Sequence, residues 1–303
     1  MSSLSPRWLI APLVVLASLF TLKAADAPKP LLWKIDGAKP SYVFGTIHLA
    51  SPDVTTMTPA TEKAVESADA LYTEVPMDMA GQLKAAMALM GGESLAVALP
   101  KDLYTQAEAE LKRINPVLDL KAFDTMKIWA LAVTISLIEE QLKNPAAMPL
   151  DAVLFTKAQS AGKEVGGLET LEEQAGVFEG FSKGEQIVML KATLDDMEKA
   201  RKDARSPIEE LRKAYLSGDL QSLDKTLNDW MENFDPKLLA RFMDALLTKR
   251  NIVMAERIGA KLKAAPGKSQ FFAVGAGHLI GDAGVLKLLE KQGLKVTRVT
   301  EAP

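Results

Sequence analysis

The chain has 303 residues, of which 48% are hydrophobic and 25% are charged, with a formal net charge of −3. This composition is typical of a globular protein and excludes extensive disorder, and the length suits one large α/β domain or two small ones. No basic block is present, so we expect no nucleic-acid partner. Because the chain has no cysteine, a thiol nucleophile, a thiolate metal site and disulfides are excluded.

The N-terminus has the pattern of a secretory signal peptide. Arg7 precedes an apolar run from Trp8 to Phe20, and small residues follow near Ala24. The run is shorter than the roughly 18 residues that a membrane span needs. The sequence therefore predicts a signal peptide over 1–24, a periplasmic or secreted protein, and no stable membrane span after cleavage. An uncleaved membrane anchor is the alternative.

The N-terminal part of the remaining chain predicts two strands, a helix and a third strand. Residues 25–30 are predicted to be a linker, and 31–303 a single domain. Leu31–Ile35 and Tyr42–Ile47 are apolar runs joined by a turn, which indicates a hairpin. After a loop at 51–53, Thr58 is a suitable N-cap for a helix over 59–67. Strand 70–75 follows and ends at Pro76.

The middle of the chain is predicted to be mostly helical, and the end returns to strands. The helices are expected over 79–90, 101–114, 118–143 and 149–161, and over 170–263 with breaks near Gly180, Ser206-Pro207, Gly218 and Asp235-Pro236. The remaining elements are a short strand over 164–168, strand 269–274, turn 275–281, helix 282–292 and strand 294–299. The order predicts an α/β fold, with a mixed central sheet built from both chain ends and a middle strand, and a large helical insertion.

The two histidines, His48 and His278, each follow an apolar strand in a Gly-x-x-His turn. The segments are Tyr42-Val-Phe-Gly-Thr-Ile-His48 and Phe271-Phe-Ala-Val-Gly-Ala-Gly-His278. Glycine permits a sharp turn or the close approach of a ligand. Open sheets bind ligands at the carboxyl ends of their strands, and imidazole suits both metal binding and proton transfer. The alternative is that both histidines are packed structural residues.

Two acidic residues are predicted at similar positions. Glu74 closes the third strand and Glu169 follows the middle strand, so each is a candidate metal ligand or general base. Asp151 opens a helix, where a carboxylate can also serve only as a partner for the helix dipole. Arg250 in the long helix either neutralises a carboxylate of the site or clamps a substrate anion, or it is an ordinary surface cation.

Over roughly residues 31–300 the chain resembles the TraB/GumN family, which includes the pheromone-shutdown proteins and is distantly similar to Tiki-type proteases and erythromycin-esterase-like enzymes. The segments that carry the resemblance are Leu32-Trp33-Lys34, the two Gly-x-x-His motifs, Glu74, Asp151-Ala-Val-Leu, Gly167-Leu-Glu-Thr-Leu-Glu-Glu-Gln174, Arg250-Asn251, Met254-Ala-Glu-Arg257, and the final helix and strand. The resemblance implies an α/β fold with a metal site formed by His48, His278, Glu74 and Glu169, and metal-dependent peptide hydrolysis as in the Tiki branch. Leu150 stands where the family often has glycine, which leaves the role of Asp151 open.

Together, the motifs and the resemblance predict a periplasmic metal-dependent hydrolase of peptide or amide bonds. A divalent ion (Mn, Co or Zn) would be held by His48, His278 and Glu74, with Glu169 and Arg250 as further catalytic residues. The partner would be a peptide or small-molecule substrate. Three alternatives stay open: a metal-free esterase-like site, a non-catalytic protein of the cell envelope that sequesters a peptide or small ligand, and a structural envelope protein.

Overall fold

The computed structural model describes residues 30–231 and 234–300. The predicted signal peptide, 1–24, and all of the predicted linker except Pro30 lie outside these residues. Across the two described ranges, no helix has both the length and the apolar character needed to cross a membrane.

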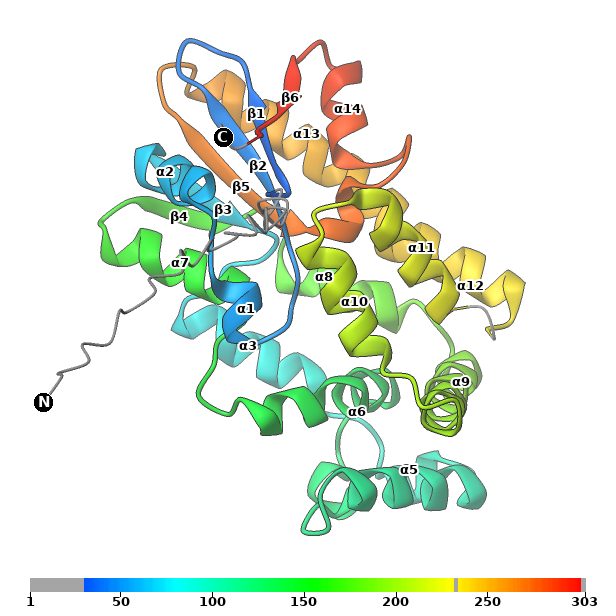
Figure 1. Cartoon of the computed structure of the whole chain (residues 1–303). Coiled ribbons are helices and arrows are strands. Elements are labelled where there is room, and N and C mark those ends of the chain that lie inside the picture. The colour runs from blue at the N-terminus through cyan, green and yellow to red at the C-terminus, as the bar shows by residue number, and fades with distance from the viewer. Residues whose placement is uncertain (1–29, 232–233, 301–303) are drawn as a thin grey trace, which may run out of the picture.

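A six-stranded mixed sheet forms the centre of the molecule (Figure 1). Its strands are β1 (Leu32–Ile35), β2 (Ser41–Thr46), β3 (Ala70–Thr73), β4 (Glu164–Gly167), β5 (Gln270–Gly275) and β6 (Val296–Arg298). In space the order is β4-β3-β5-β2-β1-β6. The first four of these strands are mutually parallel, whereas β1 is antiparallel to both of its neighbours. The predicted α/β class, and the meeting of both chain ends in one sheet, are confirmed.

Helices cover both faces of this sheet. The connections from β2 to β3 and from β3 to β4 proceed in one direction across the sheet, and the connection from β4 to β5 returns. Right-handed crossovers therefore place α2 (Pro59–Ser67) and α7 (Leu150–Ser160) on one face and α13 (Lys249–Ala264) on the other (Figure 1). The predicted cap of α2 is confirmed, because the Thr58 side chain accepts a hydrogen bond from the Thr61 amide.

The pairing of β2 with β5 fixes the position of the two Gly-x-x-His turns. The strands are parallel and in register, with Gly45 opposite Val274 and Thr46 opposite Gly275. Both strands are buried in the main core, where Phe271 and Phe272 are fully buried. Because the two strands end side by side, the turns that follow them begin at the same edge of the sheet.

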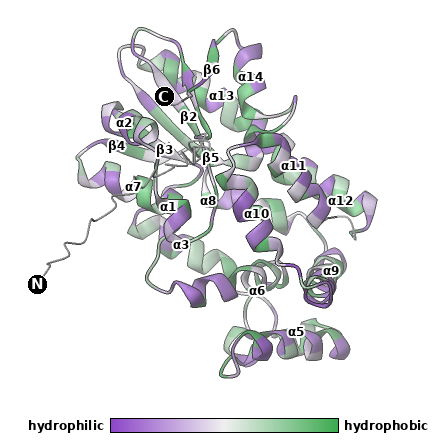
Figure 2. Cartoon of the chain, viewed as in Figure 1, coloured by the Kyte–Doolittle hydropathy of each residue, from purple (hydrophilic) through white to green (hydrophobic). Residues whose placement is uncertain are grey.

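The predicted helical insertion is also confirmed, and it has a core of its own. The connection from β3 to β4 contains, besides α7, the helices α3 (Met79–Leu89), α4 (Leu95–Ala98), α5 (Lys101–Ile114), η1 (Leu120–Phe123) and α6 (Ile128–Lys143). The connection from β4 to β5 contains α8 (Leu171–Glu179), α9 (Lys183–Lys202), α10 (Pro207–Leu216), α11 (Leu220–Trp230), α12 (Pro236–Met243) and η2 (Asp244–Thr248), and then α13. Buried leucines of α5, α6 and α9, such as Leu111, Leu131 and Leu190, form a second hydrophobic cluster. Figure 2 shows hydrophobic and hydrophilic residues on the same helices in this lobe, as expected for helices with one buried side.

Several predicted boundaries differ from the structure by one to three residues, and three differences have a clear local cause or change an element. The segment predicted as one helix over 118–143 is a 3-10 turn followed by α6, because Met126 pairs with Met90 in an antiparallel bridge and keeps the chain extended before Ile128. The predicted loop at 51–53 contains the start of a short helix, α1 (Pro52–Thr55). The last helix, α14 (Val285–Lys291), begins three residues later than predicted, after Gly281 with φ of +72° and Gly284 at the N-cap.

Candidate active site

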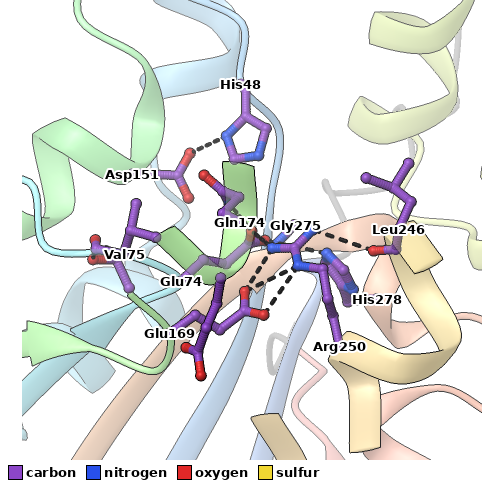
Figure 3. A network of polar contacts seen from close by, with 12 residues as sticks. His48, Glu74, Val75, Asp151, Glu169, Gln174, Leu246, Arg250, Gly275 and His278 are labelled. Carbon is purple, nitrogen blue, oxygen red and sulfur yellow. Dashed lines mark hydrogen bonds and ion pairs between the residues drawn. The ribbon is translucent and has the colours of Figure 1, made fainter. Parts of the chain in front are cut away.

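Four predicted site residues meet at one edge of the sheet. Strands β2, β3, β4 and β5 are parallel, so their carboxyl ends lie at the same edge. His48, Glu74, Glu169 and His278 each follow one of these ends by one to three residues. The side chains lie close together there with Arg250, which reaches in from α13 (Figure 3).

Arg250 is a buried clamp between two carboxylates. Its Nη2 donates to Glu74 Oε2 at 2.6 Å and to Glu169 Oε2 at 2.7 Å, and its Nε donates to Glu169 Oε1 at 3.1 Å. The side chain is only 8% exposed, so the interpretation of Arg250 as an ordinary surface cation is wrong. One guanidinium thus holds two acidic groups whose mutual repulsion would otherwise be large in a buried place.

The helix that carries Arg250 contains a π turn directly before it. Helices α12 and α13 are joined without a break by η2, a π-helical segment over Asp244–Thr248. Such turns interrupt the regular hydrogen bonding of a helix and are frequent at functional sites. Here the Leu246 carbonyl accepts a hydrogen bond at 3.2 Å from Nη1 of Arg250, which fixes the guanidinium from its own helix.

Glu74 is charged and fully engaged. Its Oε1 accepts the Gly275 amide at 2.6 Å, and its Oε2 accepts Gln174 Nε2 at 3.2 Å as well as Arg250. Burial works against ionisation, but the two histidines, Arg250 and the Gly275 amide outweigh it and lower the pKa of Glu74 to about 2. Burial raises the pKa of Glu169, against the opposing effect of its hydrogen bonds to Arg250.

The tautomer of His278 follows from its partner Asn251. The Ala283 carbonyl can only accept, so it takes the Asn251 amide nitrogen as donor at 2.9 Å. Asn251 Oδ1 must then accept from His278 Nδ1–H, at 2.6 Å. Burial lowers the pKa of His278 to about 4, so the neutral ring presents an unprotonated Nε2. That nitrogen faces Glu74 Oε1 at 3.5 Å.

His48 is oriented by Asp151, whose role the sequence left open. Asp151 is buried, accepts Thr46 Oγ1 at 2.6 Å on one oxygen, and pairs with His48 Nδ1 at 2.9 Å through the other. The charge of Asp151 raises the pKa of His48 to about 9. The side chain of His48 is 55% exposed, so water screens this pair and reaches the ring.

Gly275 marks the centre of the arrangement. A Cβ built on this residue would lie 3.0 Å from Glu74 Oε1, 3.5 Å from His278 Cδ2 and 3.8 Å from His48 Nε2. Glycine therefore leaves space in which these three side chains converge, next to the backbone of β5.

The donors at this centre are of the kinds that bind Mn, Co or Zn. They are two imidazole nitrogens and a carboxylate oxygen, and each imidazole is held through Nδ1 by an Asp or Asn oxygen, as is usual for histidine ligands. Their spacing is different from that of a formed site: the described part of the chain contains no group of three or more His, Asp or Glu side chains that could hold a metal ion. The chemistry and orientation of the donors fit a divalent ion, and coordination would require the side chains to draw closer.

Sequence reasoning did not assign roles to three of the supporting side chains. They are Thr46, Gln174 and Asn251, which bond to Asp151, Glu74 and His278 respectively. The sequence did contain a signal for Asn251, because this polar residue stands next to Arg250 on a helix of otherwise amphipathic pattern. No local pattern indicates that Gln174 faces Glu74 across 100 residues of chain.

A cavity of about 470 Å³ opens above this edge of the sheet. Its floor contains His48, Glu74, Arg250 and His278, and its walls are apolar side chains of the surrounding helices. Glu169 does not line it, and instead faces a second cavity of about 420 Å³, which Arg250 also lines. Of the two carboxylates on the clamp, only Glu74 is therefore in the main cavity.

The fold and the site define a class of α/β proteins with a mixed sheet. At the carboxyl edge of that sheet lie two Gly-x-x-His turns, a buried glutamate and an arginine that joins two carboxylates. The chain matches the TraB/PrgY/gumN family over residues 31–298 and belongs to that family.

The curated relatives include proteins named as metalloproteases. The chain is 27% identical over 311 residues to Metalloprotease TIKI2 of Danio rerio and 27% identical over 307 residues to Metalloprotease TIKI1 of Homo sapiens, in each case over 88% of this chain. It spans only 60% and 61% of those relatives. It is also 25% identical to the uncharacterized protein YbaP of Shigella flexneri, over 89% of this chain and 93% of that protein. No solved structure matches the chain.

Proposed function

We propose that this protein is a metal-dependent hydrolase of peptide or amide bonds, exported to the periplasm by the predicted signal peptide. The observation that carries the proposal is the pair formed by His278 Nε2 and Glu74 Oε1, two buried hydrogen-bond acceptors that face each other at 3.5 Å. The names of the TIKI relatives support a metal in such a site.

Two acceptors that face each other at this distance favour a positive centre between them. The Asn251 contact assigns the His278 proton to Nδ1, and the low pKa of His278 disfavours a second proton at neutral pH. Glu74 is negative, since its pKa is about 2. A divalent cation satisfies both groups, at a separation near that of neighbouring ligands around one ion, roughly 3.3 Å for metal–ligand bonds of about 2.0 Å.

In this proposal each side chain has a defined role. His48 Nε2, His278 Nε2 and Glu74 Oε1 hold the ion, while Asp151 and Asn251 orient the two rings through Nδ1. Arg250 positions Glu74, and Glu169 positions Arg250. Glu169 and Arg250 are therefore positioning residues in this proposal, and not catalytic residues. The pKa of Glu74 is also far below that of an effective general base at neutral pH.

A bound divalent ion would polarise a substrate carbonyl and lower the pKa of a bound water. The protein contributes the orientation of that carbonyl over Gly275, beside the Glu74 carboxylate, and a largely apolar cavity that limits competing water. His48 must release its Nε2 proton to bind the ion. Because Asp151 raises the pKa of His48, ion affinity should increase as the pH rises toward 9.

The second candidate is a protein that sequesters a peptide or small ligand without turnover. The observation that favours it is that Glu74, Asp151 and Glu169 are all engaged by protein donors. At this edge, within the described ranges, no carboxylate is left free to act as a base. A metal-free esterase-like site with His48 as its base is disfavoured, since the pKa of about 9 keeps that ring protonated at neutral pH.

The decisive experiment is metal binding by the purified, chelator-treated chain. Zn²⁺, Mn²⁺ and Co²⁺ are titrated by calorimetry, and the visible spectrum of Co²⁺ reports the ligand field. We expect one ion per chain for the wild type and loss of binding in His48→Ala, His278→Ala and Glu74→Gln. Glu66→Gln, which changes a carboxylate with 67% side-chain exposure, is the matched control and should bind as the wild type does.

An unbiased peptide-library digest with the metal-loaded protein then separates the two candidates. Cleavage that disappears in His278→Ala supports the hydrolase. Ion binding without cleavage of any peptide or of any other amide supports the sequestering protein. Unchanged ion binding in the double variant His48→Ala/His278→Ala would contradict the proposed site itself.

A further inference from the structure

We propose that the substrate is an acyl amide or acyl ester, whose aliphatic chain fills the cavity above the sheet edge while its carbonyl lies at the floor. This inference rests on the proposed hydrolase and names its substrate class. It follows from the chemistry of the cavity walls.

The polar groups of the cavity are confined to its floor. Apart from Trp129, each polar side chain that lines the cavity ends or follows a strand of the sheet, or is hydrogen-bonded to a group there. Gln174 and Arg250 bond to Glu74, and the Tyr215 hydroxyl donates to the Gly45 carbonyl at 2.9 Å. One polar functional group of a ligand can therefore be recognised at the floor.

The walls are apolar on every side that the structure describes. They include Leu89 of α3, Trp129 of α6, Phe178 of α8, Leu211 of α10, Leu227 of α11 and Leu247 of η2. Their backbone groups are largely used within these helices, so the described walls provide mainly hydrocarbon surface. The exception is the indole N–H of Trp129, which is buried and has no hydrogen-bond partner.

This lining distinguishes an acyl chain from an extended peptide. A peptide adds one N–H and one C=O with every residue, or about every 3.3–3.6 Å, and each needs a partner when it is buried. Beyond the floor the described walls offer a single side-chain N–H donor, that of Trp129, and no side-chain carbonyl or hydroxyl, so a peptide would bury unsatisfied groups. An acyl chain has one carbonyl and then only methylenes, which matches one polar floor and apolar walls.

The size of the cavity and the helix α3 agree with such a ligand. A volume of about 470 Å³ is within the range of roughly 300–1,000 Å³ for small-molecule pockets. Helix α3 lines the cavity with Ala85, Ala88 and Leu89, and exposes Leu83 and Met87 to solvent at 62% and 67%. Apolar surface therefore continues from the cavity to the outside, along a helix that is largely hydrophobic in Figure 2.

The reaction on this substrate is an ordinary hydrolysis. The acyl carbon–nitrogen (or carbon–oxygen) bond breaks, the hydroxyl of water bonds to the acyl carbon, and the remaining proton goes to the leaving amine (or alcohol). The products are a fatty acid and an amine or alcohol, and no oxidant or reductant is needed.

The test measures binding and turnover separately. Binding of N-methylhexanamide, N-methyloctanamide and N-methyldecanamide to the full chain, below their micelle concentrations, is followed by calorimetry. We expect the affinity to rise about fourfold for each added methylene, as burial of hydrocarbon predicts. Hydrolysis of the corresponding 4-nitroanilides by the metal-loaded protein should follow the same order. An acetylated tetraleucine amide is the peptide competitor, and should bind more weakly than the decanamide.

A pair of variants on one helix provides the matched control. Ala88→Phe places a ring in the cavity and should lower affinity for the decanamide about tenfold or more, whereas Ala86→Phe, on the exposed side of α3, should change it less than about twofold. Leu227→Trp tests the opposite wall in case Ala88→Phe disturbs α3.

The outcomes separate this inference from the proposed function. Affinity that does not depend on chain length, or tighter binding of the tetraleucine amide, overturns the acyl substrate even if peptides are cleaved. Chain-length-dependent binding without hydrolysis of any nitroanilide or peptide supports the acyl ligand and overturns the hydrolase.

Discussion

Arg250 is the residue on which the geometry of the site depends most. It joins Glu74 to Glu169 in a place where all three side chains are less than a tenth exposed. Buried ion pairs contribute little net stability when intact, but the loss of one partner leaves uncompensated charge. Arg250 therefore serves mainly to hold the two carboxylates in position, and its removal should lower the free energy of unfolding.

We expect Arg250→Met to lower the free energy of unfolding by about 3–5 kcal/mol, because two buried carboxylates then face each other. Urea unfolding measures the change. Arg205→Met, which breaks an exposed pair with Glu210, is the control and should cost less than about 1 kcal/mol. Adding Glu169→Gln to Arg250→Met should restore part of the loss. No recovery in the double variant would show that charge repulsion is not the cause.

The His48–Asp151 pair predicts a pH dependence of stability in chelator-treated protein. The folded pKa of His48 is about 9 and the ordinary value is 6.5, so the charged ring stabilises the fold fully below pH 6.5, and this contribution disappears as the pH rises through 9. Thermal unfolding between pH 6 and 10 should show this decline. Its amplitude should be modest, since the ring is half exposed.

The variant that isolates this effect is His48→Gln, in which the decline over the same pH range should flatten. Asp151→Asn should lower the pKa of His48 toward its ordinary value, which NMR titration of the ring measures directly. An unchanged His48 pKa in Asp151→Asn would contradict the assigned cause.

At the scale of single elements, the end of β5 determines the space at the centre of the site. We expect Gly275→Ala to place a methyl group 3.0 Å from Glu74 Oε1 and to reduce ion affinity at least about tenfold, at a stability cost of about 1–3 kcal/mol. Calorimetry and thermal unfolding measure the two effects.

Gly267→Ala is the matched control, because its added methyl group meets nothing within 4 Å. It should leave ion affinity unchanged. If Gly275→Ala binds the ion as the wild type does, the centre of the site is not beside Gly275.

The helix α12–η2–α13 shows what local pattern can and cannot predict. Its amphipathic sequence indicated a helix with breaks near Asp235-Pro236, and the structure has α12 beginning at Pro236. The π turn over Asp244–Thr248 was not predicted, since its residues are ordinary helix formers. The Arg250 side chain donates to the Leu246 carbonyl within this turn, four residues earlier in the same helix.

At the scale of the whole molecule, the protein has two hydrophobic cores with the cavity beside them. One core surrounds the sheet, and the other lies among α4, α5, α6 and α9. The ligand cavity receives side chains from the sheet edge and from the helical insertion, including Trp129 of the second core. A substitution in either core should therefore alter the shape of the cavity.

We expect Leu131→Ala, at a fully buried position of α6, to cost about 2–5 kcal/mol and to act locally. Amide hydrogen exchange in α5, α6 and α9 should accelerate while β2 and β5 keep their protection. Val117→Ala, at a position 84% exposed, is the control and should change neither. Equal loss of protection in the sheet would show that the two cores unfold as one unit.

The sequence by itself determined the strands, most helices and the positions of His48, Glu74, Glu169 and His278 at strand ends. These features depend on local periodicity and on turn residues, which act over a few neighbouring positions. The meeting of both chain ends in one sheet was also expected, whereas the parallel pairing of β2 with β5 is known only from the structure.

Only the tertiary structure decided the partners of those four residues. Arg250 reaches Glu74 across 176 residues and Glu169 across 81, and Asp151 reaches His48 across 103. Such contacts depend on the rotation and packing of α13 and α7 against the sheet, which no local pattern encodes. The apolar cavity has the same origin, because its walls come from helices that are distant in sequence and meet only when the insertion packs over the sheet edge.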